Sequence, residues 1–373
     1  SWSNMPMQRF LFLFGFIFLL QSSVFAQSTT IFIHPDKHYR NGLQLLQSGK
    51  FAAAIVQFDK YVDDGDDALK ISDAAYYKAY CSIQLKNRDG EALIERYIRK
   101  YPNSDKAHLA YYELGKLKYA ERDYRQAIAF FEKCYFSQLS KTQADEAHFK
   151  LGYAYFTQKQ FDKAYEHFDV LKRITNPYQF PSSYYAGYIN YENGEYDRAY
   201  YDFKRIEDNE AYARVVPALL AKVLYRQERY DELINYASDA LNKPGVSEKQ
   251  ELNLYLGEAY YVNNNFEKAA EYFNAFTGSK NSKPDRGLLF RIADTQQKAG
   301  YTEKATENFK EVALTDDTLG LYASYYLGNL YLKEGNKPFA LTAFLQARDG
   351  KVDREVRDEA AFKYAKVQYD LGN

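Results

Sequence analysis

Apolar residues recur every three to four positions along most of this chain, a period typical of amphipathic α-helices. A small residue returns within this pattern at intervals of 34 to 37 residues, at Gly42, Ala79, Gly115, Gly152, Gly187, Ala221, Gly257, Ala293, Gly328 and Ala365. In seven of nine complete intervals an alanine follows twelve residues later, and a phenylalanine four residues after that. The pattern predicts a series of helical hairpins whose small residues let paired helices approach closely.

Two hairpins depart from this pattern, and turn residues mark the breaks between helices. The register slips near Gly90–Ala92 in the second hairpin, and Leu233 and Ala237 replace the alanine and phenylalanine of the sixth. Turns between paired helices are predicted at Ser48-Gly49, Asn193-Gly194, Ala299-Gly300 and Gly335-Asn336. No change of composition indicates a second domain, so one elongated repeat domain is expected.

The spacing of these residues resembles that of the tetratricopeptide repeat (TPR), a helix–turn–helix of about 34 residues. The third hairpin carries the resemblance best, with Tyr111, Leu114-Gly115, Ala127 and Phe131. The resemblance implies an all-α fold, a right-handed α-solenoid of about nine repeats plus one unpaired C-terminal helix. That helix is expected over Arg354–Leu371, followed by a turn at Gly372-Asn373, so the array is expected to be cut from a longer protein.

The N-terminal residues have the pattern of an export signal. Arg9 precedes the apolar run Phe10–Leu20, and Val24-Phe25-Ala26 offers small residues for cleavage after Ala26. We therefore predict a signal peptide with a short upstream leader (1–26), a linker (27–34) and the repeat array (35–373). An uncleaved anchor helix is the alternative. Pro35 and Asp36 are expected to open the first helix, with Asp36 as its cap.

Charge and candidate chemistry argue against several classes of function. The chain has 49 basic and 50 acidic residues with no basic block, which disfavours a nucleic-acid binder. The five histidines show no metal-ligand spacing, and no phosphate loop or nucleophile motif is present. We therefore expect no enzymatic activity, no cofactor and no metal. Cys81 and Cys134 are predicted to be buried free thiols.

The aromatic content is unusually high, at 17%, with 38 tyrosines and 26 phenylalanines. Some of these residues fall three positions before, one after or four after the small residue, on one face of each first helix. In TPR proteins this face lines the concave groove where partners usually bind. The predicted partner-binding groove comprises Tyr76, Tyr80, Tyr112, Tyr119, Phe149, Tyr153, Phe156, Tyr184, Tyr188 and Tyr191. Packing of these rings between helices is the alternative.

One repeat junction narrows the resemblance further. Ile98–Ser104, followed by Ala107, Ala110-Tyr111 and Gly115, is similar to repeats of exported Gram-negative envelope TPR proteins such as YbgF and BamD. The likeness implies a non-enzymatic scaffold in the periplasm or at the periplasmic face of the outer membrane. Its partners would be proteins or extended peptide segments of envelope proteins, with no nucleic acid and no membrane span in the mature chain. Alternatives are a structural subunit of an outer-membrane assembly, secretion or motility machine, and the interaction domain of a larger enzyme.

Overall fold

The computed structural model describes residues 34–351 and 353–372, and within them the chain forms nineteen α-helices and no strand. The chain divides into two compact units, residues 1–106 and 107–373. The predicted signal peptide (1–26) and the linker up to residue 33 lie outside the described residues. Across the described ranges, no helix combines the length and the apolar character needed to cross a membrane.

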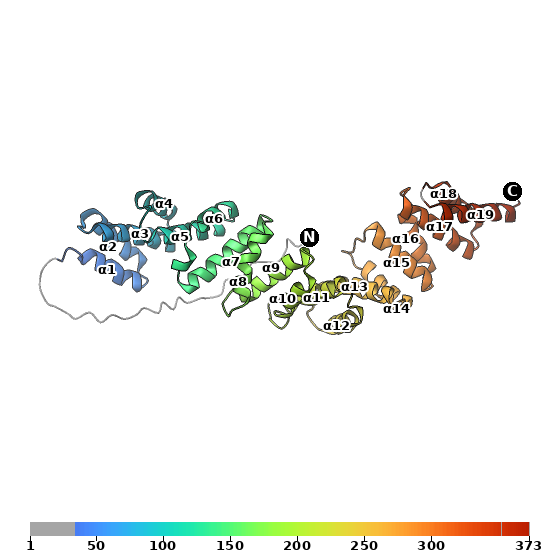
Figure 1. Cartoon of the computed structure of the whole chain (residues 1–373), viewed down its shortest axis with the longest axis horizontal. Helices are drawn as coiled ribbons and strands as arrows, with labels where there is room; N and C mark the ends of the chain where they lie inside the picture. Colours follow the sequence, from blue (N-terminus) through green and yellow to red (C-terminus); the bar gives the residue numbers. More distant parts are fainter. Residues whose placement is uncertain (1–33, 352, 373) are drawn as a thin grey trace. The chain divides into compact units, whose positions relative to one another are not determined.

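The first unit contains two helical hairpins (Figure 1), formed by α1 (Lys37–Gln47), α2 (Phe51–Asp64), α3 (Ala68–Gln84) and α4 (Gly90–Lys100). The predicted role of Asp36 as a helix cap is wrong, because its side chain makes no hydrogen bond to the first turn of α1. Its carboxylate lies 2.7 Å from Nζ of Lys70 and accepts a hydrogen bond from Tyr61 Oη at 3.2 Å. A charged partner binds a carboxylate more strongly than backbone N–H groups do, so Asp36 links α1 to α3.

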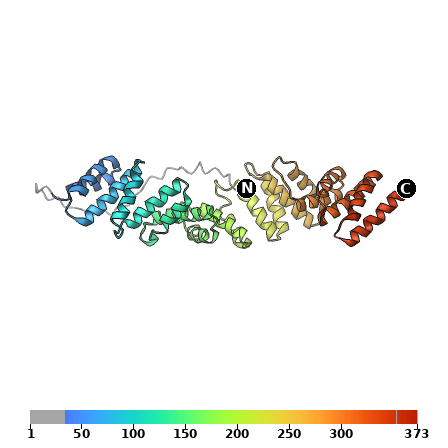
Figure 2. The ribbon, with the colours of Figure 1, turned by 90° about the horizontal axis from the view of Figure 1, so that it is seen from above.

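The second unit contains seven further hairpins and one unpaired helix. The helices are α5 (Ala107–Ala120), α6 (Tyr124–Phe131), α7 (Lys141–Thr157), α8 (Phe161–Lys172), α9 (Gln179–Glu192), α10 (Tyr196–Lys204), α11 (Val216–Arg226), α12 (Tyr230–Asn242), α13 (Lys249–Val262), α14 (Phe266–Thr277), α15 (Arg286–Lys298), α16 (Thr302–Val312), α17 (Thr318–Lys333), α18 (Lys337–Asp349) and α19 (Arg354–Asp370). The 3₁₀ helix η2 (Phe136–Gln138) lies between α6 and α7. Each helix packs on the next, and Figure 2 shows the succession from α13 to α19. The predicted α-solenoid is confirmed.

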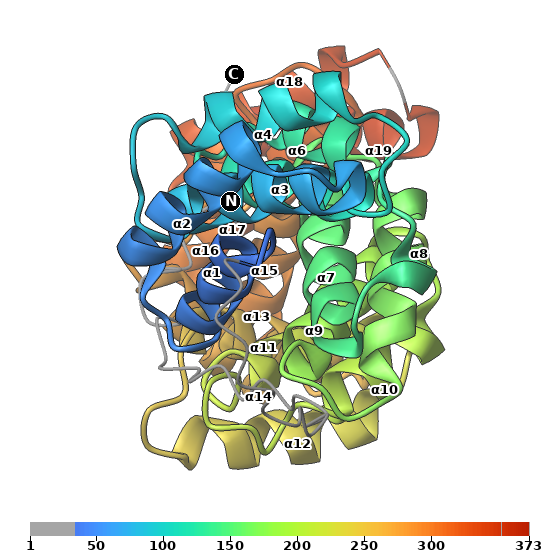
Figure 3. The same ribbon diagram turned by 90° about the vertical axis from the view of Figure 1, so that its left-hand side faces the viewer.

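We call the first helix of each hairpin its A helix and the second its B helix. Figure 3 shows α8 and α10, two B helices, on the same side of the A helices α7 and α9. The last helix, α19, has the position of an A helix and packs on the preceding B helix α18, and no B helix of its own follows it among the described residues. Its side chains Phe362 and Tyr369 are therefore 69% and 81% exposed.

The turns inside the hairpins share one backbone conformation. In eight of the nine hairpins three residues separate the A and B helices, and the middle residue has a positive φ. The predicted glycines occupy this place with φ between 67° and 88°, at Gly49, Gly194, Gly300 and Gly335. Non-glycine residues adopt it with φ between 57° and 63°, at Arg122, Lys159, Glu228 and Asn264. Only glycine enters this left-handed region without steric cost, so these turns are locally strained where another residue stands.

Each hairpin core is built on the contact that the repeat pattern predicts. A Cβ atom on Gly257 would lie 2.5 Å from the Phe273 ring, and one on Gly328 would lie 2.6 Å from Phe344. The phenylalanines of this set are completely or almost completely buried: Phe58, Phe131, Phe168, Phe203, Phe273, Phe309 and Phe344. A side chain added at Gly257 or Gly328 would therefore force the phenylalanine ring that covers the A-helix backbone to shift.

The two irregular hairpins use different residues for the same contact. Gly90 and Ile94 take the alanine and phenylalanine places of the second hairpin one residue early, and both are buried. Leu233 and Ala237 are fully buried in the sixth. The expected register slip and substitution are therefore confirmed.

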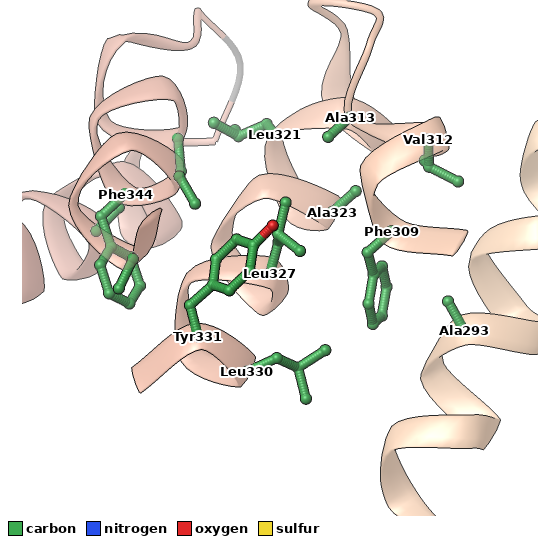
Figure 4. Packing of buried hydrophobic residues seen from close by; sticks show 14 of the residues in the cluster. Ala293, Phe309, Val312, Ala313, Leu321, Ala323, Leu327, Leu330, Tyr331 and Phe344 are labelled. Atoms are coloured by element: carbon green, nitrogen blue, oxygen red, sulfur yellow. The ribbon is translucent and has the colours of Figure 1, made fainter. Parts of the chain in front are cut away.

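The cores of neighbouring hairpins merge into larger clusters. Figure 4 shows Phe309 and Phe344, from two successive B helices, on either side of Leu327 and Tyr331 of α17. Within each unit, an A helix that follows another hairpin is thus also covered by the B helix of that preceding hairpin. The predicted buried thiols belong to other clusters of this kind: Cys81 and Cys134 are free, and burial raises the pKa of each to about 12.

Candidate partner-binding face

The ten residues of the predicted groove divide into two groups by exposure. Tyr76, Tyr112 and Tyr184 are buried, with exposed fractions of 5%, 2% and 8%. Each lies three positions before the small residue and contacts the B helix of its own hairpin. Ring centroids are 5.7 Å apart for Tyr76 and Tyr97, and 6.4 Å apart for Tyr112 and Phe131 and for Tyr184 and Phe203. At this position the rings therefore pack between the helices of the hairpin and do not line a groove.

Buried Tyr112 has a polar role as well. Its hydroxyl donates a hydrogen bond of 2.5 Å to Oε2 of Glu146 on α7. Burial raises the pKa of Tyr112, and the charge of Glu146 raises it further. Burial opposes ionisation of Glu146, but the ammonium groups of Lys150 and Lys116 outweigh that effect and lower its pKa. The ionised carboxylate therefore joins α5 to α7 at neutral pH.

This contact between a tyrosine hydroxyl and a carboxylate recurs between other successive A helices. The acceptor lies 33 or 34 residues after the tyrosine in every case: Tyr39 to Asp73, Tyr112 to Glu146, Tyr225 to Glu258, Tyr261 to Asp294 and Tyr325 to Glu359. Sequence reasoning missed these links. The spacing of one repeat between a tyrosine and an acid was the available signal.

The second group is half-buried and forms a continuous path of ring contacts over α5, α7 and α9. Centroids are 5.9 Å apart for Tyr119 and Tyr153, and 5.4 Å apart for Tyr153 and Tyr185. Phe156 lies 4.9 Å from Tyr185 and 5.4 Å from Tyr188. We call Tyr119, Tyr153, Phe156, Tyr185 and Tyr188 the aromatic face.

Tyr185 lies at the centre of this face and was not predicted. Its ring stacks on Phe168 at 5.3 Å with an interplanar angle of 20°. It lies two residues before Gly187, and tyrosine recurs at that place as Tyr77, Tyr255 and Tyr326. This recurrence could have identified it from the sequence.

The other predicted residues flank the aromatic face or lie apart from it. Phe149 stacks on Tyr178 at 4.9 Å, beside the face. Tyr191 continues it toward α11, where Nζ of Lys222 is 4.6 Å from its ring centroid and the guanidinium of Arg226 is 6.0 Å away. Tyr80 belongs to the first unit, where it stacks on Tyr76 at 6.2 Å. Residues of the second unit alone therefore form the aromatic face.

A second set of recurrent contacts lies on the B-helix side, between residues twelve positions apart. The A-helix member lies three residues after the small residue. The pairs are Asn190 and Asp202, hydrogen-bonded at 2.8 Å; Gln296 and Asn308, hydrogen-bonded at 2.8 Å; Tyr260 and Tyr272, stacked at 5.6 Å; and Tyr155 and His167, stacked at 5.8 Å. Sequence reasoning did not single out these pairs, although their fixed spacing was visible.

One of these pairs holds a buried ion pair. Asp202 of α10 is 2% exposed. Its carboxylate accepts hydrogen bonds from Lys172 Nζ of α8 at 2.9 Å and from Asn190 Nδ2 of α9 at 2.8 Å. Burial raises the pKa of Asp202, while Lys172 and Asn190 act to lower it. A buried carboxylate persists only with such partners, so this contact fixes three helices together.

The next junction along the chain is hollow. A cavity of about 260 Å³ opens between α10, α11 and α12. Its lining comprises Tyr200, Lys204, Leu220, Leu224, Glu232, Asn235, Tyr236 and Asp239. Among the described residues, no group of three or more His, Cys, Asp or Glu side chains has the arrangement of a metal site.

Known proteins resemble parts of this chain. A family model described as "Tetratricopeptide repeat" matches residues 112–178 and 219–284. No curated protein matches the sequence significantly. The two matched segments coincide with α5 to α8 and with α11 to α14.

Three solved structures share low sequence identity with the chain. The TPR domain of P58(IPK) is 16% identical, with 90% of this chain and 99% of that chain covered and a TM-score of 0.28. A tetratricopeptide repeat protein from Parabacteroides merdae is 15% identical, with 78% and 96% covered and a TM-score of 0.31. The C-terminal part of a TPR protein from Cytophaga hutchinsonii is 13% identical, with 86% and 98% covered and a TM-score of 0.35.

Proposed function

Because the chain belongs to the tetratricopeptide-repeat superfamily, whose members serve as protein-interaction scaffolds, we propose that it is a non-enzymatic scaffold that binds an extended protein segment along its aromatic face. The observation that supports this proposal is the unbroken path of half-buried rings from Tyr119 to Tyr188. These rings come from three successive A helices, so the path is long enough to follow an extended chain.

The chemistry of the aromatic face indicates a partly apolar partner segment. A tyrosine ring offers a large contact area at low entropic cost, and its hydroxyl can bond a peptide backbone. Lys222 and Arg226 lie beyond Tyr191 at the α11 end of the face and add positive charge there. An acidic residue at the matching end of the partner segment would complement them.

We further propose that the scaffold acts after export, in the envelope of a Gram-negative bacterium. The support is the N-terminal sequence, with Arg9, the apolar run Phe10–Leu20 and the small residues before Gln27. N-terminal sequencing of the native protein is expected to start at Gln27. A mature form that keeps Phe10–Leu20 would replace this proposal with a membrane anchor.

Photo-crosslinking tests the aromatic face directly. A photoreactive residue at Tyr188 is expected to form a discrete adduct in an envelope extract, because its ring lies at the half-buried end of the path. The same residue at Tyr201, which is 66% exposed on the B helix α10, is the matched control and is expected to form none. Equal adducts from both sites would contradict the proposal.

Alanine substitution then separates binding from packing. Tyr188 is half-buried and contacts the rings of Phe156 and Phe161, so Tyr188→Ala is expected to weaken partner binding by about 1–2 kcal/mol, with less loss of stability than removal of a ring in the middle of the path. Tyr153 contacts the rings of Tyr119, Tyr124, Phe149 and Tyr185, so its removal is expected to cost about 3–5 kcal/mol of stability as well. Unchanged affinity in both variants would rule out the aromatic face.

A further inference from the structure

Two histidines of the fourth hairpin meet ring to ring on the B-helix side. Nδ1 of His148 on α7 lies 2.9 Å from Nδ1 of His167 on α8. The ring centroids are 5.2 Å apart, close to the largest separation that two imidazoles joined at this N–N distance can have. The two nitrogens therefore point straight at each other, with room for one proton between them.

This geometry fits a shared proton and not a metal ion. Two imidazoles that chelate a metal direct their lone pairs at a common third point, and the lone pairs here are opposed along one line. One ring thus donates its Nδ1–H and the other accepts it, and both rings are neutral. A proton added to the accepting Nδ1 would place two N–H groups head to head.

The surroundings of the pair disfavour that second proton. Phe136 of η2 lies 4.6 Å from the His148 centroid, and Tyr155 stacks on His167 at 5.8 Å. Asp145, one turn earlier on α7, forms an ion pair with Lys141, whose Nζ lies 2.7 Å from Asp145 Oδ2. From the neighbouring elements, Glu132 at the C-terminal end of α6 accepts a hydrogen bond from the Tyr155 hydroxyl, and Lys163 Nζ of α8 lies 5.3 Å from the centroid of the Tyr155 ring. No carboxylate among the described residues forms a hydrogen bond or ion pair with either imidazole.

The first hairpin provides a natural reference for this pair. His38 and Gln57 occupy the same two helix positions, also 19 residues apart, with Nδ1 of His38 2.8 Å from Oε1 of Gln57. An amide oxygen accepts a hydrogen bond from a neutral imidazole and from an imidazolium alike. The His38–Gln57 contact is therefore insensitive to protonation, whereas a contact between two histidines is not.

We propose that the His148–His167 pair is an acid-sensitive latch, which holds α7 against α8 at neutral pH and opens when the accepting Nδ1 is protonated as well, so that both rings carry an Nδ1–H. The ligand that this pair responds to is therefore a proton. The same positions in the first hairpin hold a form that does not respond to acid.

The direction of the response follows from the burial of the pair. Burial, together with the neighbouring His148, lowers the pKa of His167 to about 4. Burial also lowers the pKa of His148, against the pull of Asp145. Histidines whose pKa is lower in the folded state contribute stability above the unfolded value of about 6.5, and this stability is lost as the pH falls toward 4.

The latch also has a consequence for the aromatic face, which rests on the function proposed above. Helix α7 also carries Tyr153 and Phe156 of the aromatic face. Loosening of α7 from α8 would disturb the middle of the path of rings. Partner binding is therefore expected to weaken in acid together with the hairpin.

Hydrogen exchange of the full chain at pH 7.5 and pH 5.0 tests the latch. After correction for intrinsic rates, protection of residues 141–172 is expected to fall at least about tenfold relative to the α17–α18 hairpin, which contains no histidine. His167→Gln, which copies the His38–Gln57 pair, should reduce this difference to less than about threefold. The reverse substitution Gln57→His should create a new acid response in the α1–α2 hairpin.

Imidazole titrations by NMR provide the second readout. Both midpoints are expected below about 6.5 in the wild type, and the His148 midpoint should rise in His167→Gln. The proposal would be overturned if residues 141–172 of His167→Gln still lost exchange protection in acid, or if both imidazoles of the wild type titrated with unperturbed midpoints. If His167→Gln abolishes the loss of exchange protection in acid but partner binding does not depend on pH, the latch is supported. Its proposed effect on the aromatic face is then wrong.

Discussion

Two neighbouring junctions on the B-helix side occupy the same repeat positions with opposite chemistry. Over α9, Lys172 of α8 meets Asp202 of α10, and Asn190 lies beneath them. Over α11, the corresponding contact is between Glu207 and Tyr236, whose hydroxyl donates a 2.8 Å hydrogen bond to Oε2 of Glu207. The first junction is sealed, whereas the second leaves a cavity of about 260 Å³.

Two features explain the difference: the length of the helix that precedes each junction, and the A-helix residue that lies beneath it, which we call the floor residue. Helix α8 continues to Lys172, whereas α10 ends at Lys204, three residues short of Glu207. The floor of the sealed junction is the polar Asn190, which requires a polar cover; the floor of the hollow junction is Leu224, which requires none. One repeat backbone therefore accepts either a buried ion pair or an open hollow above an apolar residue.

The largest expected effect comes from breaking the sealed junction. Lys172→Met leaves the 2%-exposed carboxylate of Asp202 without its nearest cation, with only the more distant Arg205 guanidinium at 3.7 Å, and is expected to cost about 3 kcal/mol, the lower end for a broken buried pair. Because coupling in a solenoid is between neighbours, the loss should be concentrated in residues 161–204 and is best measured by hydrogen exchange. The double variant Lys172→Met/Asp202→Leu is the control and should restore most of that stability.

The same variant has a defined pH dependence. Burial already raises the pKa of Asp202, and removal of Lys172 raises it further. A carboxyl whose pKa is raised in the folded state lowers stability as the pH rises from its unfolded pKa of about 3.9 to its folded pKa, so the penalty of Lys172→Met should grow as the pH rises above about 4 and level off above the folded pKa. A penalty that is independent of pH would show that Asp202 does not carry an uncompensated charge.

The sequence predicted the parts of this comparison that depend on repeat spacing. The 34- to 37-residue interval located every hairpin, because a glycine or alanine beneath a phenylalanine is a local packing rule. The early end of α10 and the pairing of Lys172 with Asp202, 30 residues apart, depend on how two hairpins stack. Asp202 was indistinguishable by sequence from the solvated carboxylates of other B helices.

The aromatic face shows the same limit of sequence reasoning. Periodicity placed the rings on one side of the A helices. It could not separate Tyr112, buried against Phe131, from Tyr188, which lies at the half-buried end of the face, because both sides of a first helix are partly covered. Contact between neighbouring hairpins decides which rings remain accessible.

A smaller effect is expected from the turns that end the two floor helices. Gly194, after α9, has φ 78°, and Glu228, after α11, has φ 57°. Gly194→Glu should destabilise the fifth hairpin by about 1 kcal/mol or more, and Glu228→Gly should change the sixth in the opposite direction by up to about 1 kcal/mol. Local hydrogen exchange across each turn measures both. If both substitutions changed stability in the same direction, the turn conformation would not determine the stability of these hairpins.

The smallest effect is expected from the hollow junction itself. Tyr236→Phe removes the hydroxyl that bonds Glu207 but leaves the ring in place over the cavity. Glu207 keeps Lys204 Nζ at 2.8 and 3.1 Å and is only partly buried, so water can replace the lost donor. The expected loss is therefore about 0.5 kcal/mol, at the low end for a hydrogen bond, measured as exchange protection in α12. Asn190→Ala, which removes one donor from the buried Asp202, is the matched variant in the sealed junction and should cost several times more. If Tyr236→Phe cost as much as Asn190→Ala, the cavity would have to be closed to water, and the contrast between the two junctions would disappear.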